Sequence, residues 1–222
     1  MNYFLEILHG TGITLLLMLF ALSIGGGLAI LMTLADFSKH VYLKAPIAAF
    51  LFFIRGTPLL VQFFLIYFGL GQFDWLRESF LWTALKEPFV CAVIALSLNS
   101  SAYTTVLLKG AVASVPETEK TACKALGMSN WLAFRRIIFP RALRMALPGY
   151  SNEVMIVLKS TSLASTITLL DLMGVTNQII GKTYEAVPYL CLAGAIYLSL
   201  NVIIIGIFKY FEKRVNIYSS VE

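Results

Sequence analysis

The chain has 222 residues, of which 59% are hydrophobic and 13% charged, and its mean hydropathy is +0.81. A soluble domain needs more polar side chains to cover its surface, so the composition excludes a soluble globular protein and predicts a membrane protein. The net charge of +5 is not arranged as a basic stripe with interleaved aromatic residues, which argues against a nucleic-acid partner. The absence of an internal repeat or linker predicts one all-α domain over residues 1–222.

Five apolar runs follow one another along the chain, each near the length of a helix that spans a bilayer. In chain order they are Thr11–Leu34, Pro46–Leu70, Phe89–Leu108, Met145–Leu170 and Val187–Phe208. The first run lacks the basic start and small-residue cleavage site of a signal peptide, so we expect it to remain as a membrane anchor. Because five is an odd number of crossings, the two termini should face opposite sides of the membrane.

Lys and Arg residues are distributed unevenly between the connections. The connections 35–45 and 109–144, with the tail after Phe208, hold twelve of the seventeen basic residues, whereas the loops on the opposite side hold only three. Basic residues accumulate in cytoplasmic loops. We therefore expect the carboxyl terminus in the cytoplasm and the amino terminus on the other side.

The second run is interrupted early by the segment Arg55-Gly56-Thr57-Pro58. The helix should break there, because Pro58 cannot donate a hydrogen bond to Ile54 and Gly56 adds backbone freedom. Broken membrane helices can build substrate sites, and Gln62, one turn after Pro58, could offer its amide to a substrate. A kink that only improves packing explains the break equally well.

The stretch LGQFDWLRESFLWTALKEP, residues 70–88, connects the second and third runs. Its aromatic and leucine spacing predicts a short amphipathic helix that lies in the outer membrane interface. Trp75 and Trp82 would anchor such a helix at the level of the lipid headgroups.

A polar, basic insert, PETEKTACKALGMSNWLAFRRIIFP at 116–140, separates the third and fourth runs. It combines helix-forming residues, an apolar stripe at Ala122 and Leu126, a glycine at Gly127 and a proline at Pro140. A solvated loop does not need an apolar stripe, which would stay exposed without a partner. We therefore interpret the insert as a helix that docks on another protein.

Glu153 lies inside the fourth run, where an unpaired acid costs about 2.5 to 3.5 kcal/mol. Glu153, Val157, Ser160 and Ala164 fall on one helical face. This mostly small and polar stripe suits a water-filled path, and it favours Glu153 and Ser160 as substrate contacts. The alternatives are a structural ion pair of Glu153 with Lys159 or with the arginine of the second run, or an interfacial carboxylate near the start of the helix.

Asp171 follows Glu153 by eighteen residues, which returns it to nearly the same face of a continuous helix, about 27 Å further along. That separation excludes the binding of one amino acid by both carboxylates. We retain Asp171 as a candidate in the substrate path, near an outer gate. The alternative is a cap of the next helical turn, because Asp favours helix starts.

Several segments together resemble the polar amino-acid permease family of ATP-binding-cassette (ABC) importers, over nearly the whole chain. The insert is similar to the EAA loop of that family through Ala122, Gly127, Ile137 and Pro140. The other matching segments are RGTPLLVQ at 55–62, LSLN at 96–99 followed by Ala102-Tyr103, SNEV at 151–154 and LKSTSL at 158–163.

The resemblance implies the type I ABC importer permease fold, with five transmembrane helices and a cytoplasmic coupling helix. It places the chain in the cell inner membrane with a periplasmic amino terminus. It also implies three protein partners: a second permease subunit in a heterodimeric pore, a periplasmic amino-acid-binding protein and an ABC ATPase. The ATPase would dock on Ala122, Leu126, Gly127, Ile137 and Pro140.

The chain should have neither a catalytic residue nor a cofactor of its own. ATP and Mg are expected on the ATPase, because no GxxxxGK[ST] segment occurs here. Three scattered cysteines and two distant histidines indicate no metal site. Thr121 and Val106 stand where the family usually has glutamates, and the second change suggests that the two halves of the pore contribute unequally.

The resemblance and the acidic candidates favour a basic amino acid as substrate, with arginine first. Histidine, lysine, ornithine and glutamine are the alternatives within the family. From a different class, a self-sufficient channel or secondary carrier could also use Glu153 and Lys159. The odd number of helices, the lack of a repeat and the docking insert argue against that class.

Overall fold

The computed structural model describes residues 3–37 and 41–216, and within these ranges all regular structure is helical, which confirms the predicted fold class. The longer helices are α1 (Tyr3–Asp36), α2 (Val41–Gly56), α3 (Leu59–Phe64), α6 (Pro88–Ala113), α7 (Glu117–Ala125), α9 (Phe139–Ser160), α10 (Leu172–Thr183) and α11 (Ala186–Asn216). The short ones are the π-helical η1 (Leu65–Gly69) and η3 (Phe134–Ile138), the 3-10 segments η2 (Leu70–Gln72) and η4 (Thr161–Ile167), and the one-turn helices α4 (Asp74–Arg77), α5 (Trp82–Leu85) and α8 (Asn130–Ala133).

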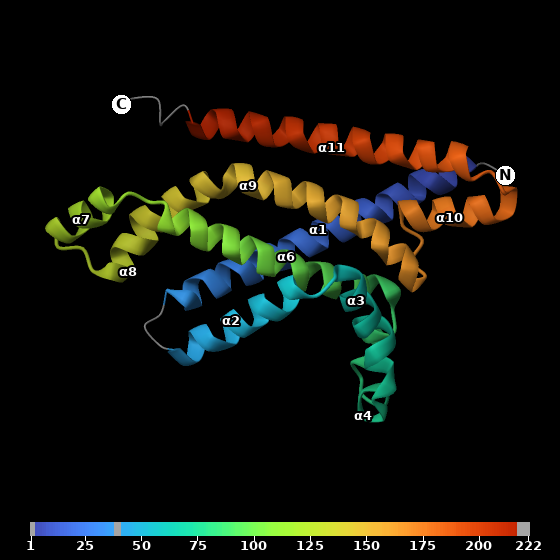
Figure 1. Cartoon of the computed structure of the whole chain (residues 1–222), viewed down its shortest axis with the longest axis horizontal. Helices are drawn as coiled ribbons and strands as arrows, with labels where there is room; N and C mark the ends of the chain where they lie inside the picture. Colours follow the sequence, from blue (N-terminus) through green and yellow to red (C-terminus); the bar gives the residue numbers. More distant parts are fainter. Residues whose placement is uncertain (1–2, 38–40, 217–222) are drawn as a thin grey trace.

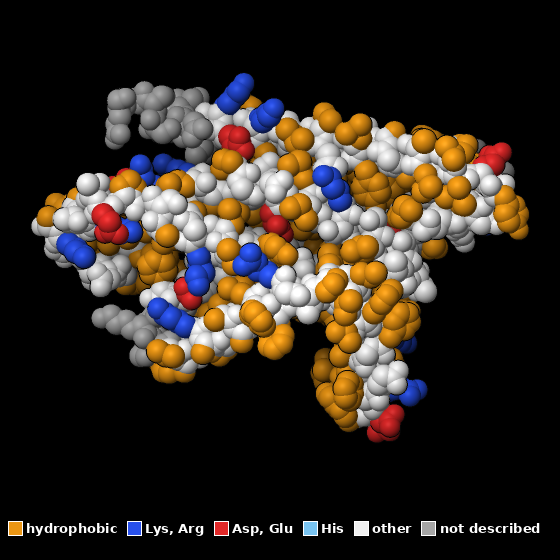
Figure 2. All heavy atoms as spheres, viewed as in Figure 1, with side chains coloured by type: hydrophobic (Ala, Val, Ile, Leu, Met, Phe, Trp, Pro, Cys, Tyr) orange, Lys and Arg blue, Asp and Glu red, His pale blue; other side chains and the backbone are white. Residues whose placement is uncertain are grey.

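The long helices α1, α6, α9 and α11 form an elongated bundle (Figure 1). Helix α1 passes behind α6 and α9, and α11 lies along α9 and α10, while α7 and α8 form the tip at one end. Charged side chains on the face in Figure 2 gather toward that tip, and hydrophobic side chains cover much of the rest. Three of the described helices are long and apolar enough to cross a membrane, or up to five if each of two bent pairs is one span.

Helix α1 packs closely on two neighbours because glycines face them. A Cβ atom on Gly25 would lie 2.9 Å from the carbonyl oxygen of Ser97 on α6. A Cβ atom on Gly10 would lie 2.9 Å from the carbonyl oxygen of Asp171, just before α10. Small residues allow such close backbone approach in membrane bundles. These contacts fix α6 and α10, which carry many of the buried polar residues, against α1.

The second apolar run, Pro46–Leu70, is broken as predicted. Helix α2 ends at Gly56, and the axes of Val41–Gly56 and Leu59–Gln72 differ by 106°. Pro58 has an extended backbone, with φ −61° and ψ 136°, and it lacks the N–H that would continue the helix. A turn of this size is far larger than a packing kink, and it sends α3 and α4 away from the bundle (Figure 1).

The fourth apolar run also differs from the expected single helix over Met145–Leu170. Helix α9 gives way to η4 at Thr161, and η4 ends at Thr168, which has a left-handed φ of 66°. Helix α10 then leaves at 48° to the preceding segment. Asp171 therefore does not continue the helical face of the fourth run.

The stretch 70–88 forms the two one-turn helices α4 and α5 rather than the expected amphipathic helix. The ring of Trp82 lies against Gly71, where an added Cβ atom would be 3.1 Å from the ring. Trp75 is 70% exposed. Only Trp75 of the two expected anchors therefore has the exposed position that an interfacial tryptophan takes.

Candidate substrate cleft and docking helix

A polar cleft of about 470 Å³ opens where α2 breaks, between α2, α6 and α9. The break contributes Arg55, Gly56, Thr57, Pro58 and Leu59, helix α6 contributes Asn99 and Tyr103, and α9 contributes Glu153, Ile156 and Ser160. Small-molecule sites typically measure about 300 to 1,000 Å³. The structure thus brings the predicted Glu153 and Ser160 together with the broken segment. Within the described residues, no group of three His, Cys, Asp or Glu side chains could hold a metal ion.

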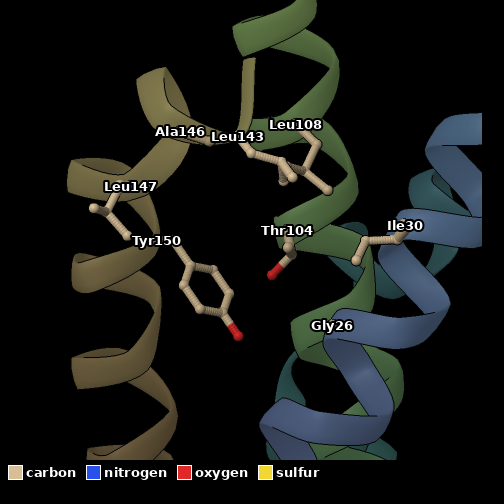
Figure 3. A pocket seen from close by; sticks show the side chains of 8 residues that line it. All are labelled: Gly26, Ile30, Thr104, Leu108, Leu143, Ala146, Leu147 and Tyr150. Carbon is tan, nitrogen blue, oxygen red and sulfur yellow. The ribbon is translucent and has the colours of Figure 1, made fainter. Parts of the chain in front are cut away.

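A second cavity, of about 320 Å³, lies between α1, α6 and α9 (Figure 3). Its walls are apolar except for the hydroxyls of Thr104 and Tyr150, which point into it from opposite sides (Figure 3). No charged side chain is among its lining residues. A zwitterionic ligand needs partners for its charges, so the polar cleft is the better candidate site.

Glu153 is only 7% exposed, and it lies on the wall of the cleft. Among the described residues it forms no ion pair. The two cations that the sequence offers as partners for Glu153 do not pair with it. Arg55 lies over the ring of Tyr103, and Lys159 lines a different cavity. A buried carboxylate without a cation is costly within a membrane, so the cleft suits a ligand that brings positive charge.

Arg55 also lines the cleft and is exposed. Its guanidinium carbon lies 5.3 Å from the centre of the Tyr103 ring, within cation–π range. Sequence reasoning treated Arg55 only as a possible ion-pair partner. Its position immediately before the Gly-Thr-Pro break was the signal that could have marked it as a cleft residue.

Gln62 lies beside the break and is not among the residues that line the cleft. Its Nε2 atom donates to the carbonyl oxygens of Ile54 at 2.8 Å and Thr57 at 3.2 Å. Its Oε1 atom accepts from Nδ2 of Asn99 on α6 at 3.3 Å. Since Pro58 has no N–H to offer Ile54, the Gln62 amide replaces the missing donor. The structure places Gln62 as a brace of the broken helix, where both ends of its amide are used.

Asp171 is fully buried and is not among the residues of the cleft. Its Oδ1 atom accepts the N–H of Gly174 at 2.9 Å, which caps α10. The N–H of Leu172 donates to the hydroxyl of Thr14 on α1 at 3.0 Å. The capping alternative is therefore confirmed, and the structure places Asp171 where it fixes α10 against α1.

The predicted polar stripe of α9 is only partly present. Ser160 reaches the cleft, whereas Val157 and Ala164 are buried in the core. The helical face does not continue past Ser160, because η4 has a 3-10 rather than an α-helical period. At the end of η4 the hydroxyl of Thr168 lies 3.3 Å from that of Tyr67 in η1, so a hydrogen bond joins the two interrupted spans.

The insert folds as α7, a turn and α8, at the tip of the bundle (Figure 1). Glu117 and Glu119 lie in the first turn of α7 and Lys124 in the last, which suits the helix dipole. The hydrogen bond from Lys120, at 2.8 Å, lowers the pKa of the Glu117 carboxyl from its ordinary value. Arg141 of α9 forms an ion pair with Glu119 at 2.9 Å, which ties α7 to the bundle.

Gly127 ends the first helix of the insert in a left-handed conformation, with φ 70°. The N–H of Gly127 donates to the carbonyl of Lys124 at 3.0 Å, and that of Met128 donates to Cys123 at 3.0 Å. This paired closure of a helix end favours glycine, whose missing Cβ removes the steric penalty. Gly127 therefore forms the turn that separates α7 from α8.

The tip is anchored on one face and bare on the other. Cys123 is buried in a core cluster, and Ile137 packs against that cluster. Leu126 is 78% and Trp131 59% exposed, and Ala122 is exposed too. Pro140 is the second residue of α9, immediately after the π-helical η3, and it has no N–H to donate to the preceding turn. The apolar residues of the stripe thus remain uncovered at the most charged end of the molecule.

Comparison with known proteins gives consistent relatives. A family described as binding-protein-dependent transport system inner membrane component matches residues 25–217. The octopine transport system permease protein OccM of Rhizobium meliloti is 45% identical over 209 residues, 94% of this chain and 85% of that protein. The arginine ABC transporter permease protein ArtM of Haemophilus influenzae is 41% identical over 221 residues, 100% and 97% of the two chains. The histidine/lysine/arginine/ornithine permease HisM of Escherichia coli K12 is 39% identical over 206 residues, 92% and 87%.

Two solved structures resemble the fold. An amino acid ABC transporter crystallised with histidines aligns with a TM-score of 0.87 at 30% identity, over 96% of this chain and 95% of that one. The inward-facing methionine transporter MetNI aligns with a TM-score of 0.66 at 12% identity, over 95% and 94%, which supports the fold alone. The predicted type I ABC importer permease fold is confirmed.

Proposed function

Since the chain belongs to the family of binding-protein-dependent transport system inner membrane components and is an amino-acid ABC transporter permease, we propose that it forms half of the pore of an importer for basic amino acids, arginine first. The observation that carries the substrate class is the position of Glu153. Its carboxylate lies on a polar cleft within the membrane-spanning helices and has no cationic partner among the described residues.

A cationic side chain would supply the charge that Glu153 lacks. Two opposite charges attract more strongly in a cleft of low dielectric than in water. Relatives are named for octopine, nopaline, arginine and histidine/lysine/arginine/ornithine transport. Among these cargoes the unpaired acid favours those with a basic side chain, and Ser160 adds a hydroxyl for hydrogen bonding on the same wall.

The partners follow from two exposed features. Charged Arg55 and Glu153 cannot face lipid, so a second permease subunit would close the open side of the cleft. The bare apolar stripe at Ala122 and Leu126 would dock on an ABC ATPase, which binds ATP and Mg, since this chain has no phosphate loop. A periplasmic binding protein would deliver the amino acid. Closure of the ATPase dimer would move the docked tip and open the cleft outward.

Reconstitution tests this function. The chain is co-expressed with a second permease, an ABC ATPase and a binding protein from the same organism, and uptake of labelled arginine into liposomes is measured. We expect uptake to require ATP and all four proteins, and to be inhibited by lysine, ornithine and histidine more than by glutamine. Equal inhibition by glutamine would remove the basic-substrate proposal, and ATP-independent transport by the chain alone would favour a secondary carrier.

The orientation is tested by thiol labelling. We expect a cysteine at Asn130 to be protected from a membrane-impermeant reagent in intact cells, whereas one at Glu78 reacts, because the basic connections should be cytoplasmic. Both positions are exposed in the structure. The native cysteines are first replaced, and labelling after permeabilisation is the control for reactivity at both positions. Labelling at Asn130 from outside would invert the topology.

A further inference from the structure

Arg55 is a second charged group on the cleft, and the cation-binding role of Glu153 does not use it. It forms no ion pair among the residues that the structure describes. It is the last residue but one of α2, it is exposed, and it lines the cleft that Glu153 also lines. An ionisable side chain at such a place in a membrane protein points to a functional role. A guanidinium that has no carboxylate partner in the protein is suited to bind the carboxylate of a ligand.

Arg55 is restrained at its guanidinium and in the backbone around it. Tyr103 lies under it, with 5.3 Å between the guanidinium carbon and the ring centre. The backbone of Arg55 is held by Gln62, whose amide bonds to the carbonyls of Ile54 and Thr57, on either side of Arg55 in the chain. An arginine that stacks on an aromatic ring keeps the N–H groups at its edge free for bidentate hydrogen bonds.

We propose that Arg55 binds the α-carboxylate of the transported amino acid, and that Tyr103 is a positioning residue that holds the guanidinium for this contact. The proposal rests on the proposed function, because it assigns the remaining charge of the same cleft. Arg–carboxylate pairs are often bidentate, which fixes the orientation of a ligand as well as its charge. Arg55 then selects amino acids over amines, whereas Glu153 selects among side chains.

Equilibrium binding to the assembled transporter in detergent, without the binding protein, tests this directly. Labelled arginine is displaced by unlabelled arginine or by agmatine, which is arginine without its carboxylate. For the wild type we expect agmatine to be weaker by about tenfold or more, the loss typical of one charge-assisted contact. In Arg55→Gln the affinity for arginine should fall to the level of the affinity for agmatine. The affinity for agmatine should be nearly the same in the variant and in the wild type.

Three further variants make the test specific. Arg55→Lys keeps the charge but not the planar fork, so the preference for arginine over agmatine should be intermediate. Tyr103→Phe should keep the preference because it keeps the ring, whereas Tyr103→Leu should reduce it. Lys159 is a cation that lines another cavity, so Lys159→Gln should leave the preference for arginine over agmatine unchanged.

An Arg55→Gln transporter that still prefers arginine over agmatine as strongly as the wild type would overturn the carboxylate assignment. Equal behaviour of Tyr103→Phe and Tyr103→Leu would overturn the positioning role. A failure of the proposed function looks different, because the wild type itself would then bind arginine no better than glutamine.

Discussion

Arginine uptake by the reconstituted transporter is expected to fall by about tenfold or more when Glu153 is replaced by glutamine, equivalent to about 1.4 kcal/mol or more. Glutamine keeps the shape and hydrogen bonding of the side chain but removes the charge that faces the cleft. Uptake is measured in liposomes at equal amounts of complex, with basal ATP hydrolysis recorded alongside. Glu78→Gln, an exposed acid in the connection between α4 and α5, is the matched control and should transport normally.

The neutral arginine analogue citrulline separates a charge effect from a structural one. The wild type should prefer arginine over citrulline in the same binding assay, and Glu153→Gln should lose most of that preference. If uptake stays at the wild-type level while the complex is intact, Glu153 is not in the substrate path. If the complex no longer assembles, the carboxylate has a structural role instead.

Replacing Gly127 with valine should abolish the stimulation of ATP hydrolysis by substrate-loaded binding protein while the permease still inserts and assembles. The φ of 70° at Gly127 is strained for a β-branched residue, because a Cβ atom in left-handed backbone costs roughly 1 to 2 kcal/mol. The turn would then re-form in another conformation and shift the exposed Leu126. The measurement is ATPase activity of the reconstituted transporter with and without the loaded binding protein.

Gly127→Asn is the matched variant, because asparagine tolerates the left-handed region and also ends helices. It should retain most of the stimulation. Full stimulation in the valine variant would show that the geometry of the turn does not matter for coupling. Equal loss in both variants would assign the effect to side-chain bulk at the interface rather than to backbone strain.

Some local parts of the fold were predictable from the sequence, but the angles between the helices were not. Pro58 removes a backbone donor wherever it sits in a helix, so the break in the second run could be located. The axes turn by 106° there, and Gln62 bonds both to the freed carbonyl of Ile54 and to Asn99 on another helix. The sequence does not show which residues of the third run come near Gln62, so the contact of its amide with Asn99 could not be predicted.

The end of the fourth run shows the same limit. No glycine or proline lies between Thr161 and Asp171, so nothing local announced η4 or the left-handed Thr168. The capping role of Asp171 was foreseeable because it depends only on the three residues that follow. Glu153 and Ser160 were found from the cost of polar groups in a membrane. Tyr103 was not, because its place in the cleft depends on how α2 meets α6.

The brace formed by Gln62 has a consequence for how such a permease can change its cargo. The carbonyls of Ile54 and Thr57, beside the break, each accept a hydrogen bond from the Gln62 amide, so part of their capacity to bind the ammonium groups of a ligand is already used. Recognition then falls to the side chains on the cleft walls. A new specificity can therefore arise by exchange of a few wall residues, such as Tyr103 or Ile156, on a backbone that stays unchanged.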